Sequence, residues 1–443
     1  MRTTALHNLG CKVNSYETEA MQQLLEEAGY EIVPFHEKAD VYIINTCSVT
    51  NIADRKSRQM LHRAKKQNPD AVVVAAGCYV QAAAEELKAD LAVDVIIGNN
   101  KKKDLVPILE EYFKDKSDSS HVIEISETHE YERLSIHKIA DHTRAFLKIQ
   151  DGCNQFCSYC IIPYTRGRVR SRRPDEVVAE VRELAAAGYQ EVVLTGIHLS
   201  SYGVDFKEEE KKENLLSLIK QVHEVEGIRR IRLGSLEPRI ITEEFAQALA
   251  SMPKFCPHFH LSLQSGCDKT LKRMNRHYTT EEYAAGCEIL RRYFDNPAIT
   301  TDVIVGFPGE TEEEFEETKA FLERIGFYEM HIFKYSRRAG TRADRMPDQI
   351  PEQVKSVRSE ILLKLEKQMS KAYRESFSGK KKTVLLEEKT EIGGRAYMIG
   401  HTMEYVKAVV PYADNLKNKM TEGILKEALN DEVLLLDSRN FLN

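Results

Sequence analysis

Three closely spaced cysteines are the residues of this sequence best suited to chemistry. Cys153, Cys157 and Cys160 lie in the pattern C-x3-C-x2-C, within residues 150–163. Three thiolates at this spacing can bind three irons of a 4Fe–4S cluster and leave the fourth iron free for an external ligand. The alternatives are a structural zinc site or three buried thiols. Zinc sites usually have four ligands, and no fourth Cys or His lies close by in the sequence, so the pattern favours an iron–sulfur cluster.

The position of this triad indicates what the free iron would bind. The triad follows an expected strand at 145–149, the first of a β/α series, and β/α barrels bind ligands at the carboxyl ends of their strands. In enzymes of the radical S-adenosylmethionine (SAM) type, SAM occupies that position, and an electron from the cluster cleaves it to a 5′-deoxyadenosyl radical. The protein then has to position SAM and shield the radical. We expect no catalytic residues beyond the cluster ligands.

A second set of three cysteines is dispersed in sequence but equivalent in position. Cys11, Cys47 and Cys78 each follow an expected strand of the N-terminal region. Parallel strands place their carboxyl ends at one edge of a sheet, where open α/β sheets bind ligands. The three thiolates therefore predict a second iron–sulfur cluster. The alternative is three buried cysteines, since Cys is among the most buried residue types.

The first 115 residues alternate apolar strands with amphipathic helices. This alternation predicts a doubly wound parallel sheet covered by helices on both faces. Ser15 is the expected N-cap of the first helix. The expected strands are 4–9, 41–45, 71–76 and 93–97, and the expected helices are 15–28, 52–66, 81–88 and 105–113. A polar linker, 116–142, follows, with a short strand near 122–125.

The alternation resumes in residues 143–375 and predicts a partial, TIM-like β/α barrel; an open doubly wound sheet is the alternative. A charged helix, 352–377, closes this part. Residues 376–443 contain short strands with polar breaks, which predicts a small β-barrel. The expected barrel strands are 145–149, 191–194, 230–233, 258–263, 299–305 and 328–333, and the main helices are 174–187, 214–224, 280–294 and 312–324.

Small and polar residues end the expected barrel strands. Glycine lets a backbone approach a ligand closely, and Ser, Gln and Glu can bind ribose hydroxyls or an amino group. Beside a cluster motif they outline a nucleoside pocket. The SAM-binding candidates are Thr195, Gly196, Ser235, Glu237, Gln264, Ser265 and Gly306.

Clustered basic residues are the candidates for contact with RNA phosphates, which arginine forks bind well. Five arginines follow the cluster loop within eight residues, and three lysines open the C-terminal region; part of the arginine run could instead bind the SAM carboxylate. The candidates are Arg166, Arg168, Arg170, Arg172, Arg173, Lys380, Lys381 and Lys382. The alternative is a solvated charge run.

The composition is that of a globular protein of two to four domains. The chain has 443 residues, 42% hydrophobic and 30% charged, and a net charge of −6, which argues against RNA binding by the whole surface. No apolar run is long enough for a membrane span or a signal peptide, so we expect a cytoplasmic protein with no membrane contact. Nine cysteines in such a chain indicate metal or redox chemistry rather than disulfides.

Over essentially its whole length the sequence resembles the radical SAM methylthiotransferases. The resemblance rests on LGCKVNS at 9–15, NTCSVT at 45–50, AGCY at 76–79, GCNQFCSYC at 152–160 and GRVRSR at 167–172. It implies that the N-terminal cysteines hold an auxiliary 4Fe–4S cluster that carries the sulfur to be inserted. It also implies a C-terminal TRAM domain that engages the substrate.

The resemblance further implies the reaction and its partners. One SAM methylates the cluster-bound sulfur, and a second yields the radical that removes hydrogen from the substrate carbon. The branches of the family act on isopentenyladenosine in tRNA, on threonylcarbamoyladenosine in tRNA, or on an aspartate of a ribosomal protein. Residues 10–17, 48–58 and 194–203 resemble the threonylcarbamoyladenosine branch. A reductant protein and a sulfur donor are expected partners; a non-enzymatic, metal-containing RNA-binding module is the alternative of another class.

Overall fold

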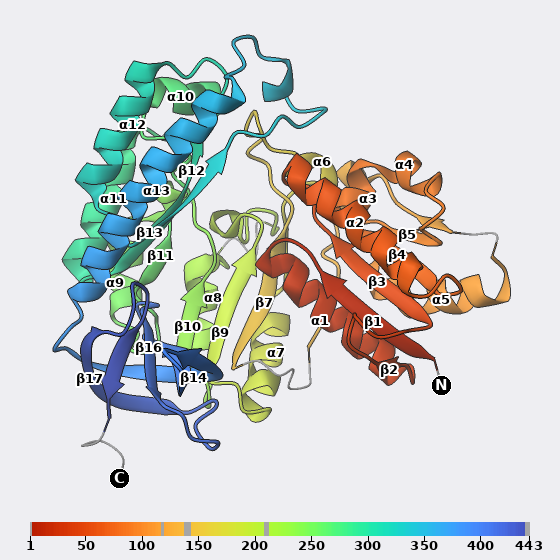
Figure 1. Ribbon diagram of the computed structural model, residues 1–443, viewed down its shortest axis with the longest axis horizontal. Helices are drawn as coiled ribbons and strands as arrows, with labels where there is room; N and C mark the ends of the chain where they lie inside the picture. The colour runs from red at the N-terminus through yellow and green to blue at the C-terminus, as the bar shows by residue number, and fades with distance from the viewer. Residues whose placement is uncertain (1, 117–118, 137–142, 208–211, 439–443) are drawn as a thin grey trace.

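The computed structural model describes residues 2–116, 119–136, 143–207 and 212–438. The chain forms an N-terminal sheet, a central barrel and a C-terminal barrel, in that order (Figure 1). Parts of the predicted linker, at 117–118 and 137–142, lie outside the described residues. No helix among the described residues is long and apolar enough to cross a membrane.

The N-terminal sheet has six parallel strands in the order β2-β1-β3-β4-β5-β6. The central strands β3 and β4 are apolar over most of their length and buried throughout, as expected for a sheet covered on both faces. β6 comes from the predicted linker. The strands are β1 Thr3–Asn8, β2 Glu31–Ile32, β3 Val41–Thr46, β4 Val72–Gly77, β5 Val95–Ile97 and β6 Ser120–His121.

Helices cover both faces of this sheet, which confirms the doubly wound prediction. One apolar cluster joins the sheet to α1 and α5, and a separate one joins it to α2, α3 and α4. The prediction that Ser15 caps the first helix is wrong, because α1 already begins at Lys12 and Cys11 is its N-cap. The helices are α1 Lys12–Glu27, α2 Asn51–Gln67, α3 Cys78–Ala82, α4 Ala84–Lys88 and α5 Leu105–Lys114.

The central strands form the predicted partial barrel. Two parallel sheets, β10-β9-β7 and β11-β12-β13, are joined by backbone bridges such as that between Leu236 and Leu261, and short β8 pairs antiparallel with β7. The strands are β7 Arg144–Asp151, β8 Arg170–Ser171, β9 Glu191–Gly196, β10 Arg230–Leu233, β11 His258–His260, β12 Ala298–Val305 and β13 Glu329–Lys334.

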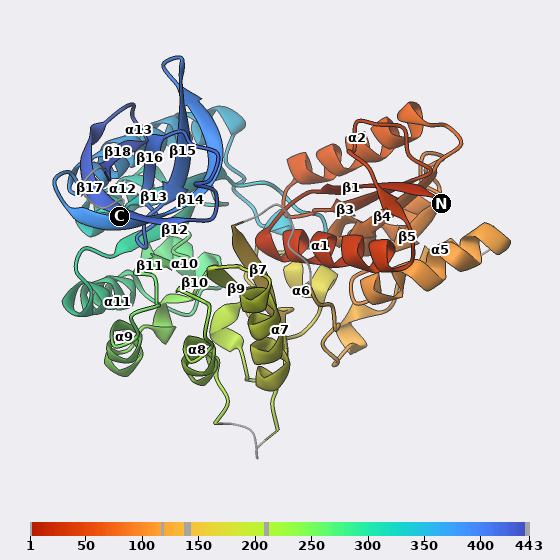
Figure 2. The ribbon, with the colours of Figure 1, turned by 90° about the horizontal axis from the view of Figure 1, so that it is seen from below.

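Helices surround the outer side of these strands, as Figure 2 shows for α7, α8, α9 and α11. Their apolar faces share one large cluster with the strands. The helices are α6 Ile162–Arg166, α7 Pro174–Ala186, α8 Leu215–His223, α9 Glu243–Ala250, α10 Asp268–Arg273, α11 Thr280–Tyr293, α12 Glu312–Ile325 and α13 Glu352–Glu375. Short 3-10 helices lie at 102–104, 125–127, 199–201, 238–240 and 343–345.

The C-terminal strands close into the predicted small barrel, in the order β14-β15-β16-β18-β17. Sequence analysis missed β17, because its inward positions are Thr421, Gly423 and Leu425, which give no alternating apolar pattern. The strands are β14 Lys381–Ile392, β15 Arg395–His401, β16 Lys407–Pro411, β17 Met420–Ala428 and β18 Leu434–Asp437.

This small barrel packs against the amino ends of the central strands. Arg230 donates to the backbone oxygen of His401 at 2.8 Å, and Arg144 pairs with Glu387 at 3.0 Å. The carboxyl ends of the strands therefore stay open toward the N-terminal sheet (Figure 1).

Candidate active site

Cys153, Cys157 and Cys160, the barrel triad, lie on the loop between β7 and α6. The loop begins at Gly152, whose φ is +70° and where a Cβ would lie 1.8 Å from the backbone oxygen of Arg168, so only glycine fits. Asn275 holds the middle of the loop by donating to the backbone oxygen of Phe156 at 3.1 Å. The triad thus has a fixed place at the carboxyl end of the first barrel strand.

A cavity of about 130 Å³ adjoins the barrel triad. The SAM-binding candidates Ser235, Glu237 and Gln264 line it together with all three cysteines. Sequence analysis missed two further lining residues, His198 and Arg276, which stand in no recognisable motif. Arg276 donates to the sulfur of Cys157 at 3.4 Å, so it is placed to orient that ligand.

The other four SAM-binding candidates do not line this cavity. The Ser265 hydroxyl lies 3.2 Å from that of Thr318 on α12, and a Cβ at Gly306 would lie 2.3 Å from Lys355 on α13. Gly196 packs against Gln150, and Thr195 is buried. These positions permit close packing of the barrel, which is why small residues occupy them. Their prediction as SAM contacts is corrected accordingly.

The barrel triad fits an iron–sulfur cluster chemically. Burial raises the pKa of the Cys153 thiol to about 11 and that of Cys160 to about 12. Metal ligation requires thiolates, so a positively charged group has to offset this burial. Iron supplies that charge. The donor set of three sulfurs, with polar side chains in the adjoining cavity, suits a cluster with one open iron and SAM beside it.

Cys11, Cys47 and Cys78, the N-terminal triad, converge as the strand pattern predicts. The parallel register pairs Asn8 with Asn45 and Thr46 with Gly77, so the ends of β1, β3 and β4 lie side by side. A Cβ at Gly10 would lie 3.0 Å from the Cys47 sulfur, so glycine is needed there. Burial raises the pKa of the Cys47 thiol to about 11. The arrangement fits a second cluster on the same argument.

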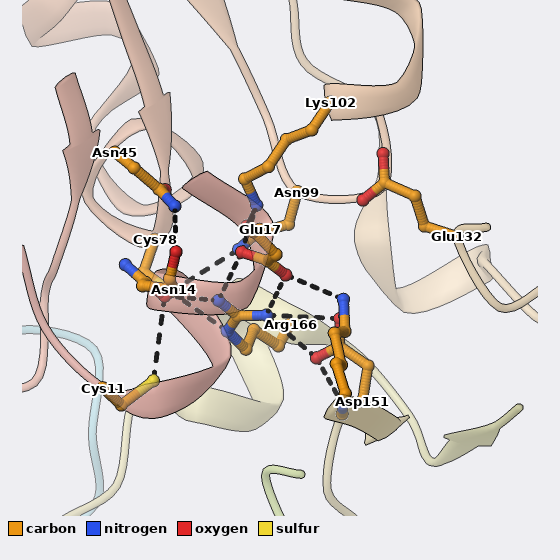
Figure 3. A network of polar contacts seen from close by, with 12 residues as sticks. Cys11, Asn14, Glu17, Asn45, Cys78, Asn99, Lys102, Glu132, Asp151 and Arg166 are labelled. Atoms are coloured by element: carbon orange, nitrogen blue, oxygen red, sulfur yellow. Dashed lines mark hydrogen bonds and ion pairs between the residues drawn. The ribbon is translucent and has the colours of Figure 1, made fainter. Parts of the chain in front are cut away.

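Arg166 connects the N-terminal triad to the barrel. This fully buried side chain, on α6, donates to the Cys78 sulfur at 3.2 Å and to Asn14 at 2.7 Å. It also pairs with Glu17 at 2.9 Å and with Asp151 at 3.1 Å, as Figure 3 shows. The network therefore joins α1 and α3 of the N-terminal sheet to β7 and α6 of the barrel.

The carboxylates of this network are held ionised by surrounding cations. Burial alone would raise the pKa of Glu17, but Arg166, Lys102 and Lys148 hold it well below its usual range. Lys148 pairs with Glu17 at 2.7 Å, and Lys102 pairs with it at 2.9 Å. A buried charge network of this kind is strongly destabilised when one member is removed.

The RNA-binding prediction is wrong for three of the five arginines. Arg166, Arg170 and Arg172 are buried and face carboxylates inside the protein, Arg172 pairing with Glu180. Their charges serve the interior rather than an RNA backbone. Arg168 and Arg173 are exposed and lie over aromatic rings, Phe156 and Phe206. In the C-terminal barrel, Lys381 pairs with Glu422, Lys382 with Glu404, and Lys380 lies over Phe377.

A second cavity, of about 240 Å³, lies between the two triads. Val49 and Thr50, which follow Cys47, form one wall, and Cys160 and Gln264 form another. Asp302 and Phe333 of β12 and β13 complete it. A substrate held here would contact both regions of the protein.

Two families match this chain. Residues 147–322 match the radical SAM superfamily, and residues 3–98 match the uncharacterized protein family UPF0004. The matches coincide with the barrel that carries one triad and with the sheet that carries the other.

Individual proteins match over nearly the full length. The chain is 43% identical over 95% of its length to the threonylcarbamoyladenosine tRNA methylthiotransferase MtaB of Bacillus subtilis, covering 93% of that protein. This chain belongs to the radical SAM methylthiotransferase family. It is also 37% identical over 86% of its length to the tRNA-2-methylthio-N(6)-dimethylallyladenosine synthase of Thermoanaerobacter, covering 81% of that protein.

Solved structures support the fold. The radical SAM methyltransferase TsrM of Kitasatospora setae matches with a TM-score of 0.58 at 18% identity, over 77% of each chain. As a member of the methylthiotransferase family, the chain is an enzyme that uses SAM and two 4Fe–4S clusters. The alternative of a non-enzymatic RNA-binding module is thereby excluded.

Proposed function

We propose that this chain is a tRNA methylthiotransferase that adds a methylthio group at carbon 2 of N6-threonylcarbamoyladenosine, next to the anticodon. The observation that carries the substrate is the 43% identity over 95% of the chain to the Bacillus subtilis enzyme named for it. The similarity to the dimethylallyladenosine synthases is lower, at 37%. Isopentenyladenosine in tRNA and the ribosomal-protein aspartate are the alternative substrates.

In this proposal the barrel triad holds the cluster that binds SAM, and the N-terminal triad holds the auxiliary cluster. When bound, these groups supply the electron that cleaves SAM and the sulfur that is inserted. Ser235, Glu237 and Gln264 bind SAM in the cavity beside the barrel triad, and Arg276 orients Cys157. The cavity between the triads receives the adenine ring, whose carbon 2 then lies within reach of both.

The remaining partners follow from the electron and sulfur balance of the reaction. Reductive cleavage of SAM consumes electrons, so a reductant protein has to supply them. Each product carries away one sulfur, so a sulfur donor has to restore it. Arg168, Arg173, Lys380 and Lys381 remain as RNA-contacting candidates, because all four are at least partly exposed. A tRNA substrate of this kind places the enzyme in the cytoplasm.

Deleting the gene in its host tests both reaction and substrate. Total tRNA is digested to nucleosides, and mass spectrometry quantifies the methylthio forms of threonylcarbamoyladenosine and isopentenyladenosine, with and without a plasmid copy. We expect selective loss of the threonylcarbamoyl product and its restoration by the plasmid. Loss of the isopentenyl product instead would move the enzyme to that branch. No change in either, in a host without a second such enzyme, would contradict a tRNA substrate.

A further inference from the structure

Lys12 is a charged residue between the two triads that the reaction so far does not use. It directly follows Cys11 and begins α1. The charged groups that act on it all belong to barrel strands, namely Arg232, Arg144, Glu191 and Asp302. Its side chain is exposed to solvent, yet desolvation by the surrounding protein lowers its pKa. Both properties together describe a group that projects into an open cavity inside the molecule.

Lys12 differs from its charged neighbours in having no partner within the described residues. Arg232 pairs with Glu191 at 2.8 Å, and Arg144 pairs with Glu387 at 3.0 Å. Asp302 lies 3.2 Å from the ring nitrogen Nε2 of His260. No hydrogen bond or ion pair joins Lys12 to any side chain that the structure describes. Lys12 is therefore an unpaired cation among paired charges.

Asp302 connects the surroundings of Lys12 to the cavity between the triads. His260, Asp302 and His331 lie side by side on neighbouring strands, with their ligand atoms within 4.8 Å of one another. This is not a free metal site, because the Nδ1 of His260 lies 2.9 Å from the Thr300 hydroxyl and its Nε2 faces Asp302. Asp302 itself lines the cavity that Cys160 and Gln264 also line. The wall opposite Lys12 is thus continuous with the proposed place of the adenine ring.

The chemistry of the proposed substrate supplies the missing partner. A threonylcarbamoyl group ends in a carboxylate and is attached to N6 of the same ring that carries carbon 2. A dimethylallyl group at that position is apolar and uncharged. A carboxylate placed inside a protein needs a cation or hydrogen-bond donors to offset its desolvation.

We propose that Lys12 binds the carboxylate of the substrate's threonyl group and thereby selects threonylcarbamoyladenosine over uncharged adenosines. This inference rests on the proposed function. It makes Lys12 a residue that determines specificity, next to a ligand of the auxiliary cluster.

Binding of anticodon stem-loop RNAs to the full-length, cluster-loaded enzyme tests the proposal. Three RNAs differ only at the target base, which carries threonylcarbamoyl, its methyl ester, or no modification. We expect the parent enzyme to bind the first RNA about tenfold more tightly than the ester, because only the free carboxylate pairs with Lys12. Lys12→Gln should bind both alike, and Lys12→Arg should keep the preference. Lys88→Gln, at a surface pair with Glu85, is the matched control.

The outcomes separate this inference from the proposed function. Equal binding of the free acid and its ester by the parent enzyme would overturn the role of Lys12, and this result needs no variant. A preference that survives in Lys12→Gln would overturn it too. If the parent enzyme also failed to distinguish the modified from the unmodified RNA, the proposed substrate itself would fall. The iron content of each variant shows whether a loss of binding comes from a lost cluster.

Discussion

Cys153, Cys157 and Cys160 come from one short loop, whereas Cys11, Cys47 and Cys78 come from the ends of three strands. The loop keeps its geometry through local contacts, such as the glycine turn at Gly152. The N-terminal triad exists only when β1, β3 and β4 are paired in register. The comparison teaches that equal ligand sets can depend on very different amounts of the fold.

The two triads also differ in what joins them to the rest of the protein. The barrel triad borders a cavity and receives a hydrogen bond from Arg276. The N-terminal triad is tied to the barrel by the buried Arg166 network. Damage to the barrel triad should therefore affect SAM chemistry, and damage around the N-terminal triad should affect sulfur transfer and stability.

The largest expected effect is the loss of chemistry when a cysteine ligand is removed. Cys153→Ala should abolish both SAM cleavage and methylthio product. Cys47→Ala should abolish the methylthio product while SAM cleavage continues, because the two clusters are held by separate residues. Chromatography of 5′-deoxyadenosine and mass spectrometry of the modified nucleoside measure the two reactions.

Cys287→Ala is the control, because Cys287 is a buried thiol outside both triads. It should retain both reactions. Formation of methylthio product by Cys47→Ala would remove the distinction between the triads.

The second prediction concerns the Arg166 network. Arg166→Met leaves Glu17 and Asp151 with one cation fewer in the interior, so the free energy of unfolding should fall by about 3–5 kcal/mol. Denaturation of the metal-loaded protein under anaerobic conditions measures this change. Arg168→Met, at an exposed arginine two positions away, should change the stability by less than about 0.5 kcal/mol. Equal effects of the two substitutions would contradict the structural role of Arg166.

A smaller effect is expected from the residue that orients the barrel triad. Arg276→Ala removes the hydrogen bond to Cys157 and should slow SAM cleavage about 10- to 100-fold, as is typical for residues that orient metal ligands. The electron paramagnetic resonance signal of the barrel cluster should change on adding SAM differently from the parent, while the auxiliary signal stays the same. Lys272→Ala, at an exposed lysine of α10, should leave both unchanged. A change confined to the auxiliary signal would reverse the assignment of the two triads.

The smallest predicted effect distinguishes two carboxyls of α1. Desolvation raises the pKa of Glu19 to about 7, whereas Glu17, with its three cations, stays ionised. Glu19 binds its proton more tightly in the folded chain, so its contribution to stability is complete below pH 4.5 and is lost as pH rises through 7. Glu19→Gln should therefore be more stable than the parent near pH 8, by about 1–2 kcal/mol, and equal to it near pH 4. Parallel pH profiles of unfolding for the two proteins would contradict this.

Much of the architecture followed from hydrophobic patterns in the sequence. The alternation of strands and helices predicted the sheet, the partial barrel and the terminal barrel, because buried parallel strands such as Val41–Thr46 are apolar runs. The strand β17 was missed where inward positions are small or polar. The start of α1 was placed too late, because the N-terminal residue Cys11 makes no side-chain cap.

The candidate site followed from the sequence where chemistry is local. Ser235, Glu237 and Gln264 were found from their places at strand ends and do line the cavity. Ser265 and Gly306 stand at similar strand ends but serve packing, since the side of the chain that each faces depends on the neighbouring helices. His198 and Arg276 carried no sequence signal because they reach the site from loops of other units.

The sequence by itself determined the cysteine ligands, their chemistry and the order of the three units, because ligand spacing and hydrophobic periodicity are properties of the chain. Only the tertiary structure decided what the charges do. Arg166 and Arg168 are two positions apart in one basic run, yet one is buried among carboxylates and the other exposed. Lys12 is likewise distinguished by the barrel strands it faces. The energy of a charge depends on its surroundings in space, and these come from residues far away in the chain.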